Sequence, residues 1–164
     1  MWGKSGSAAV PAAPMKPDCA AQPRPSAVQL TLPGKAEAVT LALREIMASD
    51  LLLGLSANLQ SSAEIVLAEV LNNIVEHAYA SHVGDIRVHL SPCDTGLCCA
   101  VTDSGGAMPG LCLPKGDIQP LGCPPDLPEG GFGWFLIRSL VTELHYQRLA
   151  DQNQLTFLLC DAQS

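Results

Sequence analysis

The pattern of hydrophobic and polar positions predicts a strand followed by two helices in the first half of the chain. Residues 28–32 alternate apolar and polar side chains, which is the period of a half-buried strand. Residues 35–53 carry apolar side chains at helical spacing and predict a first amphipathic helix. Residues 61–64 have the capping-type sequence Ser-Ser-Ala-Glu, so a second helix is expected to start there and to end near residue 81.

The second half of the chain has the pattern of four further strands. They are expected at residues 85–90, 97–102, 143–149 and 154–160. A third helix is expected over residues 133–142. The predicted order is strand, two helices, two strands, a long loop, a helix and two strands. This order is typical of an α+β two-layer sandwich, with helices packed on one face of a mixed, mostly antiparallel sheet.

Two segments lack any regular period. Residues 1–25 are rich in Ala, Pro and Ser, so we expect a disordered leader before a single domain at residues 26–164. Residues 104–130 contain six glycines and six prolines. A loop of this length in a compact domain is usually a lid or a binding loop.

Composition excludes several classes of function. The formal net charge of −7 argues against direct binding of nucleic acid or of an anionic membrane, because both need a basic surface. The most apolar run, residues 51–55, is far too short to span a membrane. Pro11 and Pro14 interrupt any signal-peptide core, and the seven cysteines lack zinc-type spacing. We therefore expect a reduced cytoplasmic protein.

The second predicted helix carries the first candidate site. Glu69, Asn73, Glu76 and His77 fall within about 100° of one another on the helix. An ordinary amphipathic helix with a solvated face would give the same pattern, although Asn is a poor residue in a helix interior. Functionally, the oxygen of Asn73 suits Mg²⁺, and Glu69 is placed to orient or deprotonate a hydroxyl group. His77 is expected to pack near phosphates or to hydrogen-bond within the helix.

Asp103 ends a predicted strand and is followed by a glycine pair, which makes the second candidate site. Such a sequence is often only a turn. In a binding site, Asp103 would accept a hydrogen bond from an exocyclic amine such as that of adenine. Gly105 would let the base approach the backbone, and Met108 would offer a soft apolar surface to a flat ring.

Gly131, Phe132 and Gly133 run directly into the third predicted helix. The free backbone N–H groups of a helix start form a natural seat for phosphate. The chain contains no G-x-x-x-x-G-K-[ST] sequence, so this is not a P-loop. Trp134 has the helical spacing of a core or interface residue.

Taken in order, these three segments resemble the asparagine box and the two glycine boxes of the GHKL ATPase superfamily. The resemblance covers roughly residues 26–161. It implies a Bergerat ATP-binding fold that uses ATP and Mg²⁺. In this fold Asn73 would bind Mg²⁺, Asp103 the adenine amine, and residues 131–133 the phosphates.

The same resemblance implies roles for residues outside these segments. It places the hydroxyl of Thr156 beside the adenine-binding Asp103. Lys115, the only basic residue in the loop, would stand in for an arginine that relatives often have near the phosphates, without its guanidinium fork. Ala107 replaces the second glycine that is usual in the first glycine box.

The small size and the pattern Glu69-x-x-x-Asn73-x-x-x-His77-Ala-Tyr most resemble the anti-sigma-factor serine/threonine-protein kinases. This resemblance implies that Glu69 serves the phosphorylation of a serine on a STAS-type anti-anti-sigma partner, which controls a sigma factor. It also implies that the chain can form a homodimer. Two alternatives are an ATP-dependent sequestering module without catalysis and the catalytic domain of a two-component histidine kinase.

Overall fold

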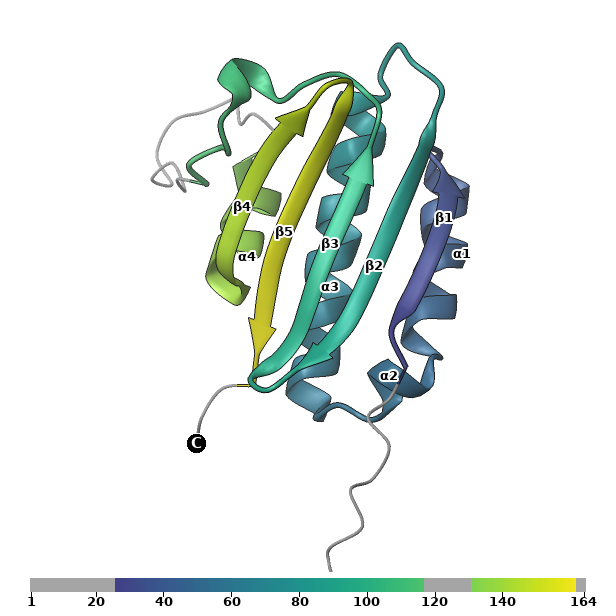
Figure 1. Cartoon of the computed structure of the whole chain (residues 1–164), viewed down its shortest axis with the longest axis vertical. Helices are drawn as coiled ribbons and strands as arrows, with labels where there is room; N and C mark the ends of the chain where they lie inside the picture. Colours follow the sequence, from purple (N-terminus) through teal and green to yellow (C-terminus); the bar gives the residue numbers. More distant parts are fainter. Residues whose placement is uncertain (1–25, 117–130, 162–164) are drawn as a thin grey trace, which may run out of the picture.

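The computed structural model describes residues 26–116 and 131–161, and its central element is a five-stranded sheet. The sheet order is β1-β2-β3-β5-β4 (Figure 1). The strands are β1 (Val28–Pro33), β2 (Asp85–Cys93), β3 (Gly96–Asp103), β4 (Thr142–Leu149) and β5 (Gln152–Cys160). All four pairings between these strands are antiparallel, so the expected α+β fold is confirmed, with no parallel pair among the described strands.

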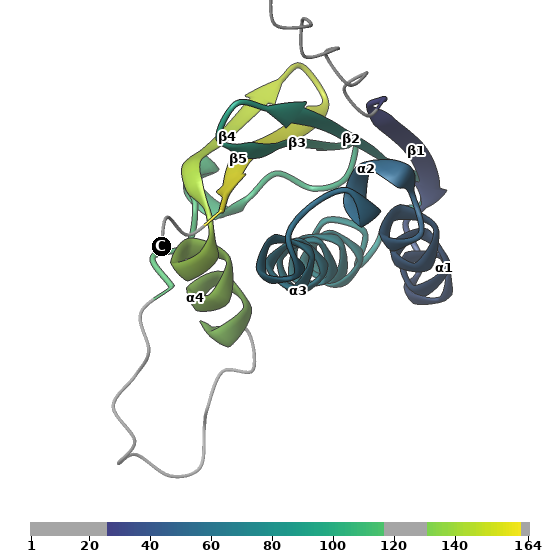
Figure 2. The same cartoon turned by 90° about the horizontal axis from the view of Figure 1, so that it is seen from below.

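The long helices cover one face of this sheet and leave the other face open (Figure 2). The helical elements are α1 (Ala36–Met47), α2 (Asp50–Leu53), α3 (Ala57–Asn73), the π-helix η1 (Ile74–Ala78), the 3₁₀-helix η2 (Pro109–Leu111) and α4 (Gly131–Leu140). The sequence predicted both the sandwich and its helical face. Within the described ranges, no helix combines the length and apolarity that crossing a membrane requires.

Alternating burial along the strands explains how the two layers hold together. In β3 the side chains of Leu97, Cys99 and Val101 are buried against the helices, whereas those of the intervening residues are only half-buried. From the helical side, Val66 and Leu67 of α3 are fully buried in the same core. The alternation follows from the pleat of the strand, which points successive side chains to opposite faces.

The first half of the helical layer differs from the prediction in two places. The helix expected over residues 35–53 is two helices, because the Ser49 hydroxyl accepts a hydrogen bond from Leu52 N at 3.4 Å and starts α2. The next helix begins at Ala57, earlier than the predicted start at residue 61. There Ser56 is the cap, and its Oγ accepts from Leu59 N at 3.2 Å.

Three later boundaries also differ. The strands predicted over residues 85–90 and 97–102 leave a longer turn than the one observed between β2 and β3. The observed turn is shorter because β2 continues through Pro92. The pairing of β1 ends opposite Leu90, so the missing N–H of Pro92 meets no strand on that side. The helix expected over residues 133–142 is displaced to Gly131–Leu140, and β5 starts at Gln152.

Tyr79 ties together four segments that are distant in the sequence. Its hydroxyl donates to Asp85 O at 2.8 Å and accepts from Ser104 N at 3.0 Å. Its ring fills the space beside Gly34 and Gly84, so a Cβ atom at Gly84 would lie 2.8 Å from the ring. The end of the α3–η1 helix is thereby fixed against the starts of α1 and β2 and the end of β3.

The predicted leader (residues 1–25) lies outside the described residues, as does part of the predicted lid, residues 117–130.

Candidate functional site

A cavity of about 520 Å³ lies at the end of the sheet where β3 stops. Its volume is in the range of about 300–1,000 Å³ that is usual for small-molecule sites. Four parts of the fold line it: the end of α3 with η1, the loop after β3, the β4–β5 hairpin and α4. The lining residues are Val70, Asn73, Ile74, Glu76, His77, Ala78, Ala80, Asp103, Gly106, Ala107, Met108, Pro109, Pro114, Trp134, Tyr146, Asn153 and Leu155.

Asp103 forms one polar end of the cavity. Its side chain is only 5% exposed, and Oδ1 accepts hydrogen bonds from Gly105 N at 2.9 Å and from Asn153 Nδ2 at 2.8 Å. In the described part of the chain, no hydrogen bond reaches the second oxygen, Oδ2. Burial raises the pKa of Asp103, although both hydrogen bonds and the charge of Arg148 act in the opposite direction.

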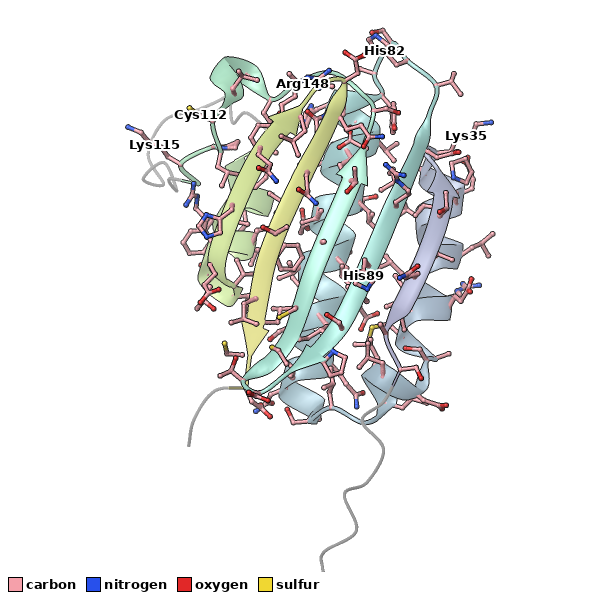
Figure 3. The ribbon with its side chains drawn as sticks, viewed as in Figure 1. Lys35, His82, His89, Cys112, Lys115 and Arg148 are labelled. Carbon is pink, nitrogen blue, oxygen red and sulfur yellow. The ribbon has the colours of Figure 1, made fainter. Side chains whose placement is uncertain are left out.

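Asn153 anchors this carboxyl group. Its Oδ1 accepts from the Tyr146 hydroxyl at 2.8 Å and from the Arg148 guanidinium at 2.7 Å. Its Nδ2 donates to Gly106 O at 2.9 Å as well as to Asp103. Arg148, labelled at this end of the sheet in Figure 3, also donates to Gly105 O at 3.1 Å. Every hydrogen-bonding position of the Asn153 amide is therefore used.

The loop after β3 packs directly on the π-helix. Gly106 N donates to Ala78 O at 2.8 Å, and a Cβ atom at Gly105 would lie 2.5 Å from the same oxygen. Glycine is therefore required at position 105 by the helix backbone. The sequence had explained this glycine by the approach of a base, but Gly105 does not line the cavity.

Asn73, the last residue of α3, also lines the cavity and lies beside the start of α4. Within residues 26–116 and 131–161, its Nδ2 is the one buried side-chain nitrogen or oxygen that has no hydrogen-bond partner. Such a group is rare in folded proteins, where buried polar atoms nearly always find partners. The two ends of an Asn amide are interchangeable by rotation, so the position can present either a donor or an acceptor.

Glu69 and the start of α4 meet beside Asn73. A Cβ atom at Gly133 would lie 2.5 Å from Glu69 Oε2 and 3.6 Å from Asn73 Nδ2. The backbone of α4 can therefore approach the two polar side chains of α3 because position 133 has no side chain. The structure thus brings together Glu69, Asn73 and Gly133, as the sequence suggested. Glu69 itself stands beside the cavity lining.

Other predicted site residues occupy different positions. His77 is exposed and Met108 is half-buried, and both line the cavity. Gly131 begins α4, and the neighbouring Phe132 is 61% exposed and lies outside the lining. Trp134 is 6% exposed and belongs to the core, as predicted.

Thr156 and Lys115 also lie outside the lining of the cavity. The register of β3 and β5 pairs Asp103 with Asn153 and pairs Thr156 with Ala100. Because the alternation of β5 buries residues 153, 155 and 157, Thr156 lies on the open face of the sheet, so its predicted place beside Asp103 was wrong. Lys115 is exposed, and its side chain extends away from the sheet (Figure 3).

Sequence reasoning missed Tyr146, Arg148 and Asn153. The strands predicted over residues 143–149 and 154–160 left Asn153 in the turn between them. A usable signal was present in β4, where Leu144, Tyr146 and Arg148 alternate with exposed residues and therefore share one face.

Comparison with known families agrees with this geometry. The sequence model for the histidine kinase-like ATPase domain matches residues 31–159. The chain belongs to the histidine kinase-like ATPase family. The match spans all three polar segments of the site and confirms the resemblance to the GHKL superfamily.

A curated relative supports the narrower resemblance. The chain is 28% identical over 120 residues to the serine-protein kinase RsbW of Bacillus mycoides (strain KBAB4). The aligned part covers 71% of this chain and 74% of RsbW.

Proposed function

We propose that this chain binds ATP with Mg²⁺ in the cavity and acts as an anti-sigma-factor serine/threonine-protein kinase. The observation that carries the proposal is a single cavity lined both by Asp103 and by Asn73, whose Nδ2 has no partner among the described residues. Family membership supports ATP binding, and the similarity to RsbW supports a serine as the acceptor.

The Asp103 end suits an adenine ring. Oδ2 is available to accept a hydrogen bond from the exocyclic amine, while Oδ1 is held by Asn153 and Gly105. Met108 is half-buried in the wall and offers a polarizable surface to the ring. Such a site favours a flat heterocycle that donates a hydrogen bond at this edge.

The Asn73 end suits Mg²⁺ and phosphate. No group of three or more His, Cys, Asp or Glu side chains in the described ranges is arranged to hold a metal. Mg²⁺ needs no such group, because it keeps several waters and binds through one or two protein oxygens and the phosphates. Asn73 would supply its amide oxygen, and residues 131–133 would offer backbone N–H groups to the phosphates. Bound Mg²⁺ neutralises phosphate charge.

Glu69 is the proposed catalytic residue. In the proposed reaction the serine oxygen bonds to the γ-phosphorus of ATP, and the bond to the leaving ADP breaks. Glu69 orients the serine hydroxyl and accepts its proton. The close approach of Gly133 to Glu69 supports this role, because it places the carboxylate beside the proposed phosphate seat.

The proposed protein partners are a STAS-type anti-anti-sigma protein, which carries the serine, and a sigma factor. A homodimer and a cytoplasmic location belong to the same proposal.

The test is a phosphotransfer assay with Mg-ATP and a STAS-type substrate. We expect phosphoserine with the wild type and a loss of about 100-fold or more with Glu69→Gln, because a positioned proton acceptor contributes about 10²–10⁴-fold. Glu64→Gln is the matched control, since Glu64 is an exposed carboxylate on the same helix. Nucleotide binding is measured in parallel for all three proteins by calorimetry.

The outcomes separate the alternatives. Tight nucleotide binding without phosphotransfer by the wild type supports a sequestering module. Autophosphorylation on histidine supports a two-component kinase domain. A wild type that binds no adenine nucleotide contradicts all three.

A further inference from the structure

We infer that Arg148 and Asn153 are positioning residues for base recognition. Arg148 fixes the orientation of the Asn153 amide, and this amide holds Asp103 so that a single carboxylate oxygen faces the ligand. The inference rests on the proposed function and deepens it. It assigns the choice of base to the β4–β5 hairpin, which the sequence motifs of the site do not include.

The orientation of the Asn153 amide follows from its partners. Arg148 can only donate hydrogen bonds, so the atom that it contacts at 2.7 Å must be the amide oxygen. The amide nitrogen then has to face Asp103, where it donates at 2.8 Å. Without Arg148, only the Tyr146 hydroxyl would donate to the amide oxygen, so the orientation that presents the nitrogen to Asp103 would be held less firmly.

Within the described residues, the donors of this network are already committed, which leaves Asp103 as an acceptor for the ligand. The Tyr146 hydroxyl donates to Asn153 Oδ1 and accepts from Met108 N at 3.1 Å, so it is committed. Both Asn153 N–H groups are bound to Asp103 and Gly106. A base that donates at its 6-position, such as adenine, is therefore accepted. Hypoxanthine and guanine carry a carbonyl oxygen there and would oppose the carboxylate.

Arg148 contributes charge as well as orientation. Burial raises the pKa of Asp103, and the hydrogen bonds and the charge of Arg148 act against that rise. Among the described residues, the other charged or titratable groups that line the cavity are Tyr146 on β4 and Glu76 and His77 on η1, and Glu69 lies beside the lining. Loss of Arg148 would raise the pKa of Asp103 further, so the carboxyl group would take up its proton at a higher pH.

The experiment compares ADP and inosine diphosphate by calorimetry across pH. Inosine diphosphate replaces the 6-amine by a carbonyl oxygen. For Arg148→Met we expect ADP affinity to fall about 10-fold or more, since a hydrogen bond to a charged group is being removed. We also expect a smaller preference for ADP over inosine diphosphate, and a loss of ADP binding that begins at higher pH on acidification. Arg148→Lys keeps the charge and should restore the pH profile in part.

Arg87→Met is the matched control. Arg87 donates to the side-chain oxygen of Gln152 at 3.0 Å, beside Asn153 in sequence, but outside the lining of the cavity. We expect this variant to bind ADP like the wild type. Tyr146→Phe removes one donor to the Asn153 oxygen and should shift base preference in the same direction as Arg148→Met. It serves as the test if Arg148→Met does not fold.

Three results would overturn the inference. A folded Arg148→Met protein with the affinity, base preference and pH profile of Arg87→Met contradicts it directly. Equal losses for both nucleotides with an unchanged pH profile show that the network only holds the loop. A wild type that binds no ADP overturns the proposed function and this inference together, whereas the first two results leave the proposed function intact.

Discussion

Two asparagines that line the cavity differ in how the protein satisfies their hydrogen bonds. Asn153 makes four hydrogen bonds, to Asp103, Gly106, Tyr146 and Arg148. Asn73 keeps a buried Nδ2 without a partner in the described part of the chain. The fold therefore satisfies the Asn153 side chain completely. Asn73 Nδ2, in contrast, is a polar atom whose hydrogen bond a ligand would supply. The difference separates a side chain whose hydrogen bonds are all made within the fold from one that keeps a buried nitrogen unpaired among the described residues.

The largest expected effect is the loss of stability when Asn153 and its hydrogen bonds are removed. Asn153→Leu keeps a similar volume but removes one hydrogen-bond partner from the buried Asp103 carboxyl and leaves the Tyr146 hydroxyl and Gly106 O without their Asn153 partner. Each unsatisfied buried group costs about 1–3 kcal/mol, so we expect the free energy of unfolding to fall by about 3 kcal/mol. Urea denaturation without ligand measures this change. A loss below about 0.5 kcal/mol is the usual range for a surface substitution. Such a result would show that the hydrogen bonds of Asn153 contribute little to stability, and the contrast with Asn73 would disappear.

An intermediate effect is expected where α4 meets α3. In Gly133→Ala the new Cβ atom would displace the Glu69 carboxylate, which is the flexible partner in this contact. We expect phosphotransfer to slow about 10- to 100-fold, because small misplacements of reacting groups have effects of this size. Single-turnover phosphotransfer measures it, with ADP affinity as the check on binding.

A double variant tests the cause of that effect. If Gly133→Ala acts by displacing Glu69, it should add little to the defect of Glu69→Gln, because both changes remove the same interaction. Additive losses would assign the effect of Gly133→Ala to the phosphate seat alone.

The smallest expected effect has the opposite sign. Asn73→Leu removes an unsatisfied buried amide, so without nucleotide the free energy of unfolding should rise by about 1 kcal/mol. The same variant should lose the stabilisation that Mg-ATP gives to the wild type. Thermal unfolding with and without Mg-ATP measures both. Destabilisation equal to that of Asn153→Leu would show that Asn73 is already satisfied by the fold.

Local patterns predicted the parts of the site that depend on one element. Glu69 and Asn73 share a face because they lie one helical turn apart on α3, and this relation needs no tertiary information. Asp103 was placed correctly because an apolar alternation ends at it. The sandwich and its helical face followed from the order of elements, although the split between α1 and α2 did not.

The parts that depend on the register of the β4–β5 hairpin could not be predicted. Its turn consists of residues 150–151, and Ala150 has a φ of 52°, a conformation that usually calls for Gly or Asn. Because position 150 is neither Gly nor Asn, the sequence carries no sign of this short turn. The predicted turn was therefore too long, and Asn153 fell outside the predicted strand. The predicted place of Thr156 beside Asp103 came from the family resemblance, and the observed register, which pairs Asp103 with Asn153, contradicts it.

The ring of Tyr79 has a consequence for how such a chain can diverge. It occupies the volume that any side chain at Gly34 or Gly84 would need. A larger residue at either glycine is tolerable only after the aromatic ring has been replaced by something smaller. The three positions are thus expected to evolve as one epistatic unit, in which the order of substitutions decides whether the intermediate proteins fold.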